Sequence, residues 1–263
     1  MTDTRILGVI PARLGSERLP RKPLHPLLGR PLIEWVWRRV SAFSVLDACV
    51  VATDSAEVAE ACRAFGAAVE LTRPDHPSGT DRVAEVAARA AYIDYPVIVN
   101  IQGDEPFILE EHVAAAAALA AGVWDVGTVA TPVRELDAWR DPAVVKVLRA
   151  DDGAALAFTR APVPHKRGGE PSPAELASPP FLRHVGVYAY TRAALARWVA
   201  LPPGQLELLE RLEQLRPLAA GMRIGVALGG HAEAGVDTLE DARRAEARLG
   251  RMHQAAVHRT VER

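Results

Sequence analysis

Four cationic side chains follow the first apolar segment of the chain. Arg13, Arg18, Arg21 and Lys22 come directly after the run Ile6–Ile10, which we expect to form a strand. In parallel α/β sheets, ligands bind at the carboxyl ends of the strands. Guanidinium groups donate paired hydrogen bonds to phosphate oxygens, and an ammonium group adds a point charge. The pattern favours a polyphosphate site, with a solvated basic surface loop as the simpler alternative.

The loop Ile10–Pro23 has further properties of a phosphate site. Its three prolines restrict the backbone, as a preorganised binding loop requires. Backbone amides beside Gly15 and Ser16 could wrap phosphate oxygens. The loop contains neither the GK[ST] of a Walker A sequence nor the GxGxxG of a dinucleotide fold. On physical grounds alone it indicates polyphosphate binding and nothing more specific.

One aspartate at a predicted strand end could bind a metal ion, and a second precedes a predicted helix. Asp104 follows the apolar run Val97–Ile101, and Asp237 precedes the last predicted helix. Carboxylates at strand ends suit Mg²⁺, which takes oxygen ligands and retains several waters. Taken singly, each aspartate is better explained without a metal, Asp104 as a turn residue and Asp237 as the neighbour of a helix cap.

The elements that must position these side chains alternate in the first half of the chain. Apolar β-type runs alternate with amphipathic stretches, and Ser55 is suited to cap a helix. This rhythm predicts an α/β fold with a mostly parallel sheet covered on both faces. The predicted strands are Ile6–Ile10, Ala48–Ala52, Ala68–Leu71 and Val97–Ile101, and the predicted helices are Leu32–Ala42, Ser55–Phe65 and Thr80–Ala91.

The second half has shorter elements. We expect a mobile loop over Pro162–Pro180, which is rich in proline and glycine, and a polar tail over 251–263. Residues 1–250 would form one domain. The predicted strands are Gly127–Pro132, Val144–Leu148, Ala155–Thr159, Leu182–Tyr190 and Arg223–Ala227, and the predicted helices are Arg192–Val199, Glu207–Leu218 and Thr238–Leu249.

Composition narrows the function classes. The chain has 263 residues and a formal net charge of -2, so no global field attracts nucleic acid. The longest apolar helix candidate, Val113–Val123, is far shorter than the roughly 20 residues of a membrane span. The N-terminus lacks the pattern of a signal peptide. We therefore expect a cytoplasmic protein with no nucleic-acid or membrane partner, and free thiols at Cys49 and Cys62.

Seven segments, in order along nearly the whole chain, resemble the 3-deoxy-manno-octulosonate (Kdo) cytidylyltransferase family. They match PARxxSxRLPxKPL at Pro11–Leu24, GxPLI at Gly29–Ile33, TRxDHxSGTxR at Thr72–Arg82, NxQGDEP at Asn100–Pro106, FxRHxGxY at Phe181–Tyr188, LExxExLEQLR at Leu206–Arg216 and GVDT at Gly235–Thr238. The third and fifth segments are more specific than the first.

The resemblance implies a fold and an activity. The fold would be a Rossmann-like nucleotidyltransferase fold with a mostly parallel central sheet and a smaller acceptor and dimerisation subdomain. The nucleotide would bind mainly to residues 5–110, and the sugar and a second subunit mainly to residues 125–230. CMP would pass from CTP to the anomeric hydroxyl of Kdo, with Mg²⁺ as cofactor and release of pyrophosphate. The expected partners are CTP, an acidic sugar and a second copy of the chain.

The resemblance also implies roles for individual residues. Arg13, Lys22, Asp104 and Asp237 would be catalytic, and the two aspartates would bind Mg²⁺. The expected CTP-binding residues are Pro11, Ala12, Arg13, Arg18, Lys22, Ser78, Gly79, Thr80, Arg82, Gln102 and Asp104. The expected sugar-binding residues are Gln102, Arg160, His184, Tyr188, Glu213 and Gln214.

Some alternatives remain open at this stage. His184 and Tyr188 would share one face of a strand, where both could simply pack in the core. The family has glycine where this chain has Arg21, and Ala161–Pro180 departs from the family pattern. The acceptor could therefore be a related acid, such as an amino-Kdo, a nonulosonic acid or a secondary-metabolite acid. A non-catalytic nucleotide-binding protein is a third possibility.

Overall fold

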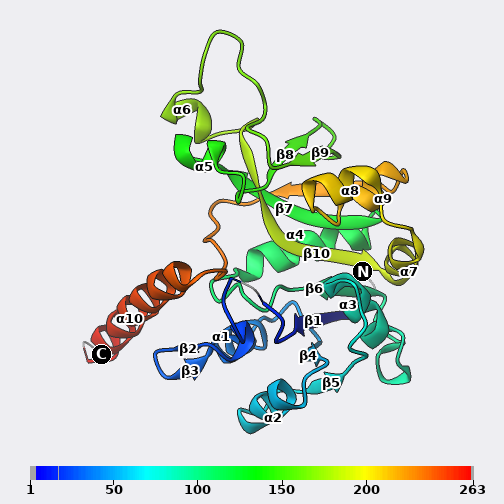
Figure 1. Cartoon of the computed structure of the whole chain (residues 1–263), viewed down its shortest axis with the longest axis vertical. Coiled ribbons are helices and arrows are strands. Elements are labelled where there is room, and N and C mark those ends of the chain that lie inside the picture. The colour runs from blue at the N-terminus through cyan, green and yellow to red at the C-terminus, as the bar shows by residue number, and fades with distance from the viewer. Residues whose placement is uncertain (1–3, 17, 262–263) are drawn as a thin grey trace.

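One twisted sheet forms the centre of the molecule (Figure 1). The structure is a computed structural model that describes residues 4–16 and 18–261, with 255–261 described as backbone only. The strand order is β11-β7-β10-β6-β1-β4-β5. These strands are β1 (Ile6–Ala12), β4 (Ala48–Thr53), β5 (Val69–Leu71), β6 (Val97–Asn100), β7 (Val126–Pro132), β10 (Leu182–Thr191) and β11 (Ile224–Leu228).

Most neighbouring strands of this path are parallel. β1 pairs in parallel with β4 and β6, as do β4 with β5 and β7 with β11. β10 lies between β6 and β7 and runs antiparallel to both. The prediction of an α/β fold with a mostly parallel central sheet is therefore confirmed.

Helices cover both faces of the sheet, as the continuous apolar strands predict. Along β1, Leu7 and Val9 belong to one hydrophobic core, whereas Ile10 and Ala12 belong to the other. The first core includes helices α3 and α7, and the second includes α1, α2 and α4. Their bounds are α1 (Leu32–Val40), α2 (Ala56–Ala64), α3 (Gly79–Ala87), α4 (Glu110–Ala121) and α7 (Arg192–Ala200).

A smaller group of elements stands at the top of Figure 1. Strand β8 pairs antiparallel with β9 and with one end of β10, which joins this group to the central sheet. Residues 125–230 are therefore continuous with the main sheet, because β7, β10 and β11 are three of its strands. The group consists of α5 (Leu136–Arg140), β8 (Lys146–Arg149), β9 (Ala155–Thr159), α6 (Pro173–Leu176), α8 (Gln205–Glu210) and α9 (Leu215–Ala219).

The predicted helix Glu207–Leu218 is wrong, because two short helices take its place. Arg211 lies between α8 and α9 in the left-handed conformation, with φ 52° and ψ 50°. Its backbone N–H donates to the carbonyl of Glu207, and so does the N–H of Leu212. A helical pattern of apolar residues continues across this break, so periodicity alone could not reveal it.

The predicted mobile loop Pro162–Pro180 contains an ordered helical turn. Ser172 and Glu175 form a capping box at the start of α6. Lys166 Nζ lies 2.8 Å from the carboxylate of Glu175. The prediction is corrected for this part, since a four-residue helix leaves no periodic signal in sequence.

The last helix is longer than expected. α10 (Leu239–Val261) continues past Gly250 and projects from the body at the lower left of Figure 1. Thr238 caps it and accepts from the N–H of Asp241 at 3.1 Å. Good helix formers follow Gly250, so the single glycine does not end the helix. The helix therefore extends past its predicted end at Leu249 into the predicted polar tail, whose residues 262–263 lie outside the described residues.

The predicted helix Thr80–Ala91 ends earlier than expected, at Ala87. Cys49 and Cys62 are free, as predicted. Among the described helices, none combines the length and the apolarity that a bilayer crossing requires. The short elements are the 3-10 helices η1 (Lys22–Leu24) and η2 (Ala90–Tyr92) and the hairpin strands β2 (Pro26–Leu27) and β3 (Arg30–Pro31).

Candidate active site

Lys22 joins the two aspartates that the sequence singled out. Its Nζ lies 2.5 Å from Oδ2 of Asp104 and 2.8 Å from Oδ1 of Asp237. Arg18 approaches the other oxygen of Asp237 at 3.2 Å. Burial would lower the pKa of Lys22, but the two carboxylates outweigh it and raise the pKa above its ordinary value. Side chains from opposite ends of the chain therefore form one charged cluster.

Close backbone packing holds the cluster together. Asp104 follows β6, which pairs with β1, and the N–H of Val236 donates to the carbonyl of Asp104 at 2.8 Å. A Cβ atom at Gly103 would lie 2.8 Å from the carbonyl oxygen of Pro11. Glycine is required there for the turn after β6 to approach the end of β1.

The carboxylates of Asp104 and Asp237 fit a divalent cation. Both point at one position, which the ammonium of Lys22 now occupies as a monocation. Two carboxylate oxygens, with phosphate oxygens of a nucleotide and water, form the all-oxygen set that Mg²⁺ prefers. The predicted metal ligands are thus adjacent, and Lys22 would have to release them to a metal.

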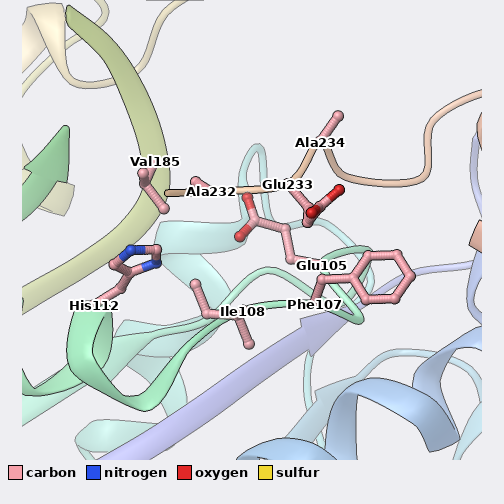
Figure 2. Close-up of a pocket in the computed structure, with 8 residues that line it drawn as sticks. All are labelled: Glu105, Phe107, Ile108, His112, Val185, Ala232, Glu233 and Ala234. Carbon is pink, nitrogen blue, oxygen red and sulfur yellow. The ribbon is translucent and has the colours of Figure 1, made fainter. Parts of the chain in front are cut away.

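A small cavity lies beside Glu105 (Figure 2). Glu105 and Glu233 point into it, and so does the buried ring of His112. Burial, together with the charge of Asp104, raises the pKa of Glu105 to about 8, against the opposing charge of Arg183. Burial and the neighbouring charge of Asp104 thus both disfavour a negative charge on Glu105.

Two other cations of the loop lie differently. Arg13 is exposed beyond the end of β1. Arg21 has a φ of 56°, in the left-handed region that favours glycine, and its guanidinium pairs with Glu57 of α2. The family has glycine at this position, and glycine adopts this left-handed conformation without strain. Arg21 therefore adds its charge beside α2 and leaves Lys22 to face the aspartates.

The segment predicted to bind CTP begins α3. Ser78 caps this helix and accepts from the N–H of Asp81 at 3.3 Å. A Cβ atom at Gly79 would meet the ring of Pro11, which precedes the buried Ala12 at the end of β1. Arg82 differs from the prediction, because it is buried and pairs with Asp54 at 3.2 Å. Its donors hold the protein together under the site.

A cleft of about 210 Å³ opens between the start of α3, the end of β6 and the turn from α8 to α9. Thr80 donates to the carboxylate of Glu213 at 3.0 Å across it. The hydroxyl of Tyr188 is buried and has no hydrogen-bond partner among the described residues. The lining residues are Gly79, Thr80, Asn100, Gln102, Tyr188, Trp198, Arg211, Leu212, Glu213 and Gln214.

Two predicted sugar-binding residues do not line this cleft. The ring of His184 packs against Phe158 and Tyr188, and its Nε2 lies 2.8 Å from the hydroxyl of Thr128. Burial lowers the pKa of His184 to about 3, so the imidazole is neutral. Arg160 donates to backbone carbonyls instead of facing the cleft.

Sequence reasoning assigned no role to three residues around the site, Glu105, Gly186 and Arg211. A Cβ at Gly186 would lie 2.7 Å from a carboxylate oxygen of Glu105, so glycine in FxRHxGxY admits that carboxylate. Arg211 lines the cleft at the one variable position between the two halves of LExxExLEQLR. The motifs contain these positions, but their neighbours come from distant segments.

Comparison with known proteins agrees with this geometry. A family model described as cytidylyltransferase matches residues 7–224. A 3-deoxy-manno-octulosonate cytidylyltransferase of Gemmatimonas aurantiaca is 51% identical over 95% of this chain and 96% of its own length. The same enzyme of Halorhodospira halophila is 47% identical over 92% and 95%.

Solved structures give the same result. A CMP:2-keto-3-deoxy-manno-octonic acid synthetase complexed with CTP superposes with a TM-score of 0.83 at 36% identity, covering 94% of this chain and 99% of its own. A 4-diphosphocytidyl-2C-methyl-D-erythritol synthase from Anaerococcus prevotii, 15% identical with a TM-score of 0.62, covers 94% and 99% and shares the fold. This chain belongs to the cytidylyltransferase family, among the 3-deoxy-manno-octulosonate cytidylyltransferases.

Proposed function

We propose that this chain transfers CMP from CTP to the anomeric hydroxyl of Kdo and releases pyrophosphate, with Mg²⁺ as cofactor. The observation that carries this proposal is the convergence of Lys22, Asp104 and Asp237 at the end of β1, next to the cleft. The names of the relatives supply the two substrates. The cleft beside the cluster supplies room for an acceptor.

The reaction is an in-line displacement at the α-phosphorus, in which positioning and charge neutralisation do most of the work. Arg18 and Lys22 would bind the triphosphate and the departing pyrophosphate, with Arg13 able to join from the exposed end of the loop. Asp104 and Asp237 would hold Mg²⁺, which supplies Lewis-acid stabilisation and helps align the sugar hydroxyl. Lys22 would then shift from the carboxylates toward the phosphates.

The cleft would hold the sugar beside the nucleotide. Gln102 and Gln214 offer amide groups to sugar hydroxyls, and Glu213 offers a carboxyl group. Burial raises the pKa of Glu213, and its bond to Thr80 fixes its position. Pro11 and Gly79, which lie in contact at the end of β1, would frame the base of CTP.

The activity is tested by pyrophosphate release with CTP, Mg²⁺ and a panel of acidic sugars that includes Kdo, an amino-Kdo and a nonulosonic acid. We expect turnover with Kdo and none when ATP replaces CTP. Asp104→Asn and Asp237→Asn should each lower kcat by about 100-fold or more, because each removes a charged metal ligand. Equal rates with ATP, or full turnover by Asp104→Asn, would contradict the proposal.

We also propose that two copies associate through the part of the chain that carries α8. Leu206, Leu208 and Leu209 of α8 are 56%, 66% and 81% exposed, and Leu156 of β9 is 62% exposed. Large exposed apolar side chains grouped on one region favour a protein interface. Light scattering after size exclusion should show a dimer, and Leu209→Glu should shift it toward monomer.

A cytoplasmic location stays a prediction.

A further inference from the structure

The cleft needs a cation if its occupant is an acid. Glu213 places a carboxyl group on its wall, whereas Asn100, Gln102 and Tyr188 contribute neutral groups. An acidic sugar entering this cleft would meet one acid and no compensating charge from these residues. A guanidinium is the side chain best matched to a carboxylate, because it can donate two parallel hydrogen bonds.

Arg160, the arginine expected from the sequence, has its donors engaged. Its Nε donates to the carbonyl of Glu210 at 2.7 Å, and Nη1 donates to that of Pro142 at 2.9 Å. Nη2 reaches the carbonyl of Arg211 at 3.4 Å. A ligand carboxylate could recruit Arg160 only by drawing its donors away from these three carbonyls. Arg160 instead holds the turn between α8 and α9 in place.

Arg216 is also committed. Its guanidinium forms a two-point ion pair with Glu207, and both side chains are nearly buried. This pair fixes α8 against α9.

Arg211 is the cation that this arrangement presents to the cleft. Among the cleft-lining residues in the described part of the chain, it alone carries a positive side chain. The side chain is exposed, and the ion pairs found among the described residues do not include it. Its left-handed backbone costs a non-glycine residue about 1–2 kcal/mol relative to the right-handed form. Such strain persists where neighbouring contacts impose it and is common at ligand sites.

We propose that Arg211 binds the carboxylate of the acidic acceptor, and that Arg160 is the residue that positions it. This inference rests on the proposed function and assigns the acceptor specificity of the same cleft. Arg211 occupies a turn that Arg160 holds at its carbonyl, while the guanidinium is left free to face the ligand.

The test compares Arg211→Gly with a matched control, Arg134→Gly. Arg134 is likewise an exposed arginine with positive φ, at 73°, but it lies away from the cleft, where its guanidinium donates to the carbonyl of Gly230. Glycine adopts the positive-φ conformations of Arg211 and Arg134 without strain, so both variants should fold. Arg211→Gly should raise KM for Kdo about 10- to 100-fold, the effect of losing a charge-assisted hydrogen bond, and leave KM for CTP unchanged. Arg134→Gly should leave both constants unchanged.

A second substrate separates the carboxylate from the rest of the sugar. With the methyl ester of Kdo, the wild-type chain should show a raised KM, and Arg211→Gly should raise it no further, because the two changes remove the same contact. Arg211→Lys should recover part of the affinity for the acid. An unchanged KM for Kdo in Arg211→Gly, or an equal penalty for acid and ester, would overturn the role of Arg211 alone. A wild-type chain inactive with every acidic sugar would overturn this role together with the proposed function.

Discussion

Gly103 lies between two residues of the site, and its lack of a side chain sets the distance between them and β1. The position has no strained backbone, so alanine could adopt its φ and ψ. The difficulty is steric, because an added Cβ would lie 2.8 Å from the carbonyl oxygen of Pro11. That contact is with backbone, which cannot rotate away as the end of a flexible side chain can.

The effect of Gly103→Ala can be worked from this distance. The turn carrying Gln102 and Asp104 must move back by about 0.6 Å for the contact to reach the ordinary 3.4 Å. Forcing a methyl group into a packed site costs about 1–3 kcal/mol of unfolding free energy. In a chain of this size each kcal/mol lowers Tm by roughly 2–4 °C. Since a displacement near 1 Å can reduce turnover about 100-fold, we expect kcat to fall by about 10- to 100-fold.

The assay pairs thermal unfolding with CTP-dependent pyrophosphate release, well below both melting temperatures. Gly79→Ala is the matched control, because its Cβ would meet the ring of the same Pro11 at 3.5 Å, an ordinary contact. That position opens α3, where alanine is favourable. Gly103→Ala should lose both stability and kcat, and Gly79→Ala should keep its stability. If the two variants melt together and Gly103→Ala keeps its kcat, the close-approach argument is refuted.

Three further predictions concern residues around the site. Arg21→Gly should be more stable than Arg21→Ala. Both variants lose the exposed ion pair with Glu57, but only glycine relieves about 1–2 kcal/mol of backbone strain. Urea unfolding measures the order of stability, and the reverse order would contradict this prediction. Arg82→Met should lose about 3 kcal/mol in the same assay by stranding Asp54, and the double variant with Asp54→Asn should recover part of it; additive losses would argue against a pair. The pKa of His184 falls from 6.5 to about 3 on folding, so the unfolded chain binds more protons than the folded chain between these two pH values. The free energy of unfolding should therefore decline as the pH falls through that window. The urea midpoint of His184→Gln should decline less from pH 7 to pH 5 than that of the wild type.

Local patterns were enough to predict the nucleotide side of the fold. The alternation of apolar runs and amphipathic stretches predicted β1, β4, β5 and β6 within a few residues, because parallel strands covered on both faces are apolar throughout. Ser55 caps α2 as its residue type predicted, accepting from the N–H of Val58 at 3.3 Å. The loop after β1 and the aspartate after β6 were also predictable, because ligand-binding residues follow strand ends.

Tertiary structure decided which predicted side chains are free to act. Arg82 and Arg160 resemble ligand-binding arginines in sequence, yet Arg82 forms an ion pair with Asp54, and Arg160 donates to the carbonyl of Glu210 at the α8–α9 turn. Hydrogen-bond partners from other parts of the chain make that difference, and no local pattern encodes them.

Local sequence patterns specify the types of group at the site, the strand-end loop that carries Lys22 and the family resemblance. Only the folded chain decided that β10 enters the sheet antiparallel between β6 and β7, that Lys22 bridges two aspartates, and that Arg211 faces the cleft. The two kinds of feature differ in how far apart along the chain the interacting residues lie. Periodicity and capping depend on neighbours a few positions away, whereas strand order, ion pairing and the break at Arg211 depend on contacts between residues tens to hundreds of positions apart.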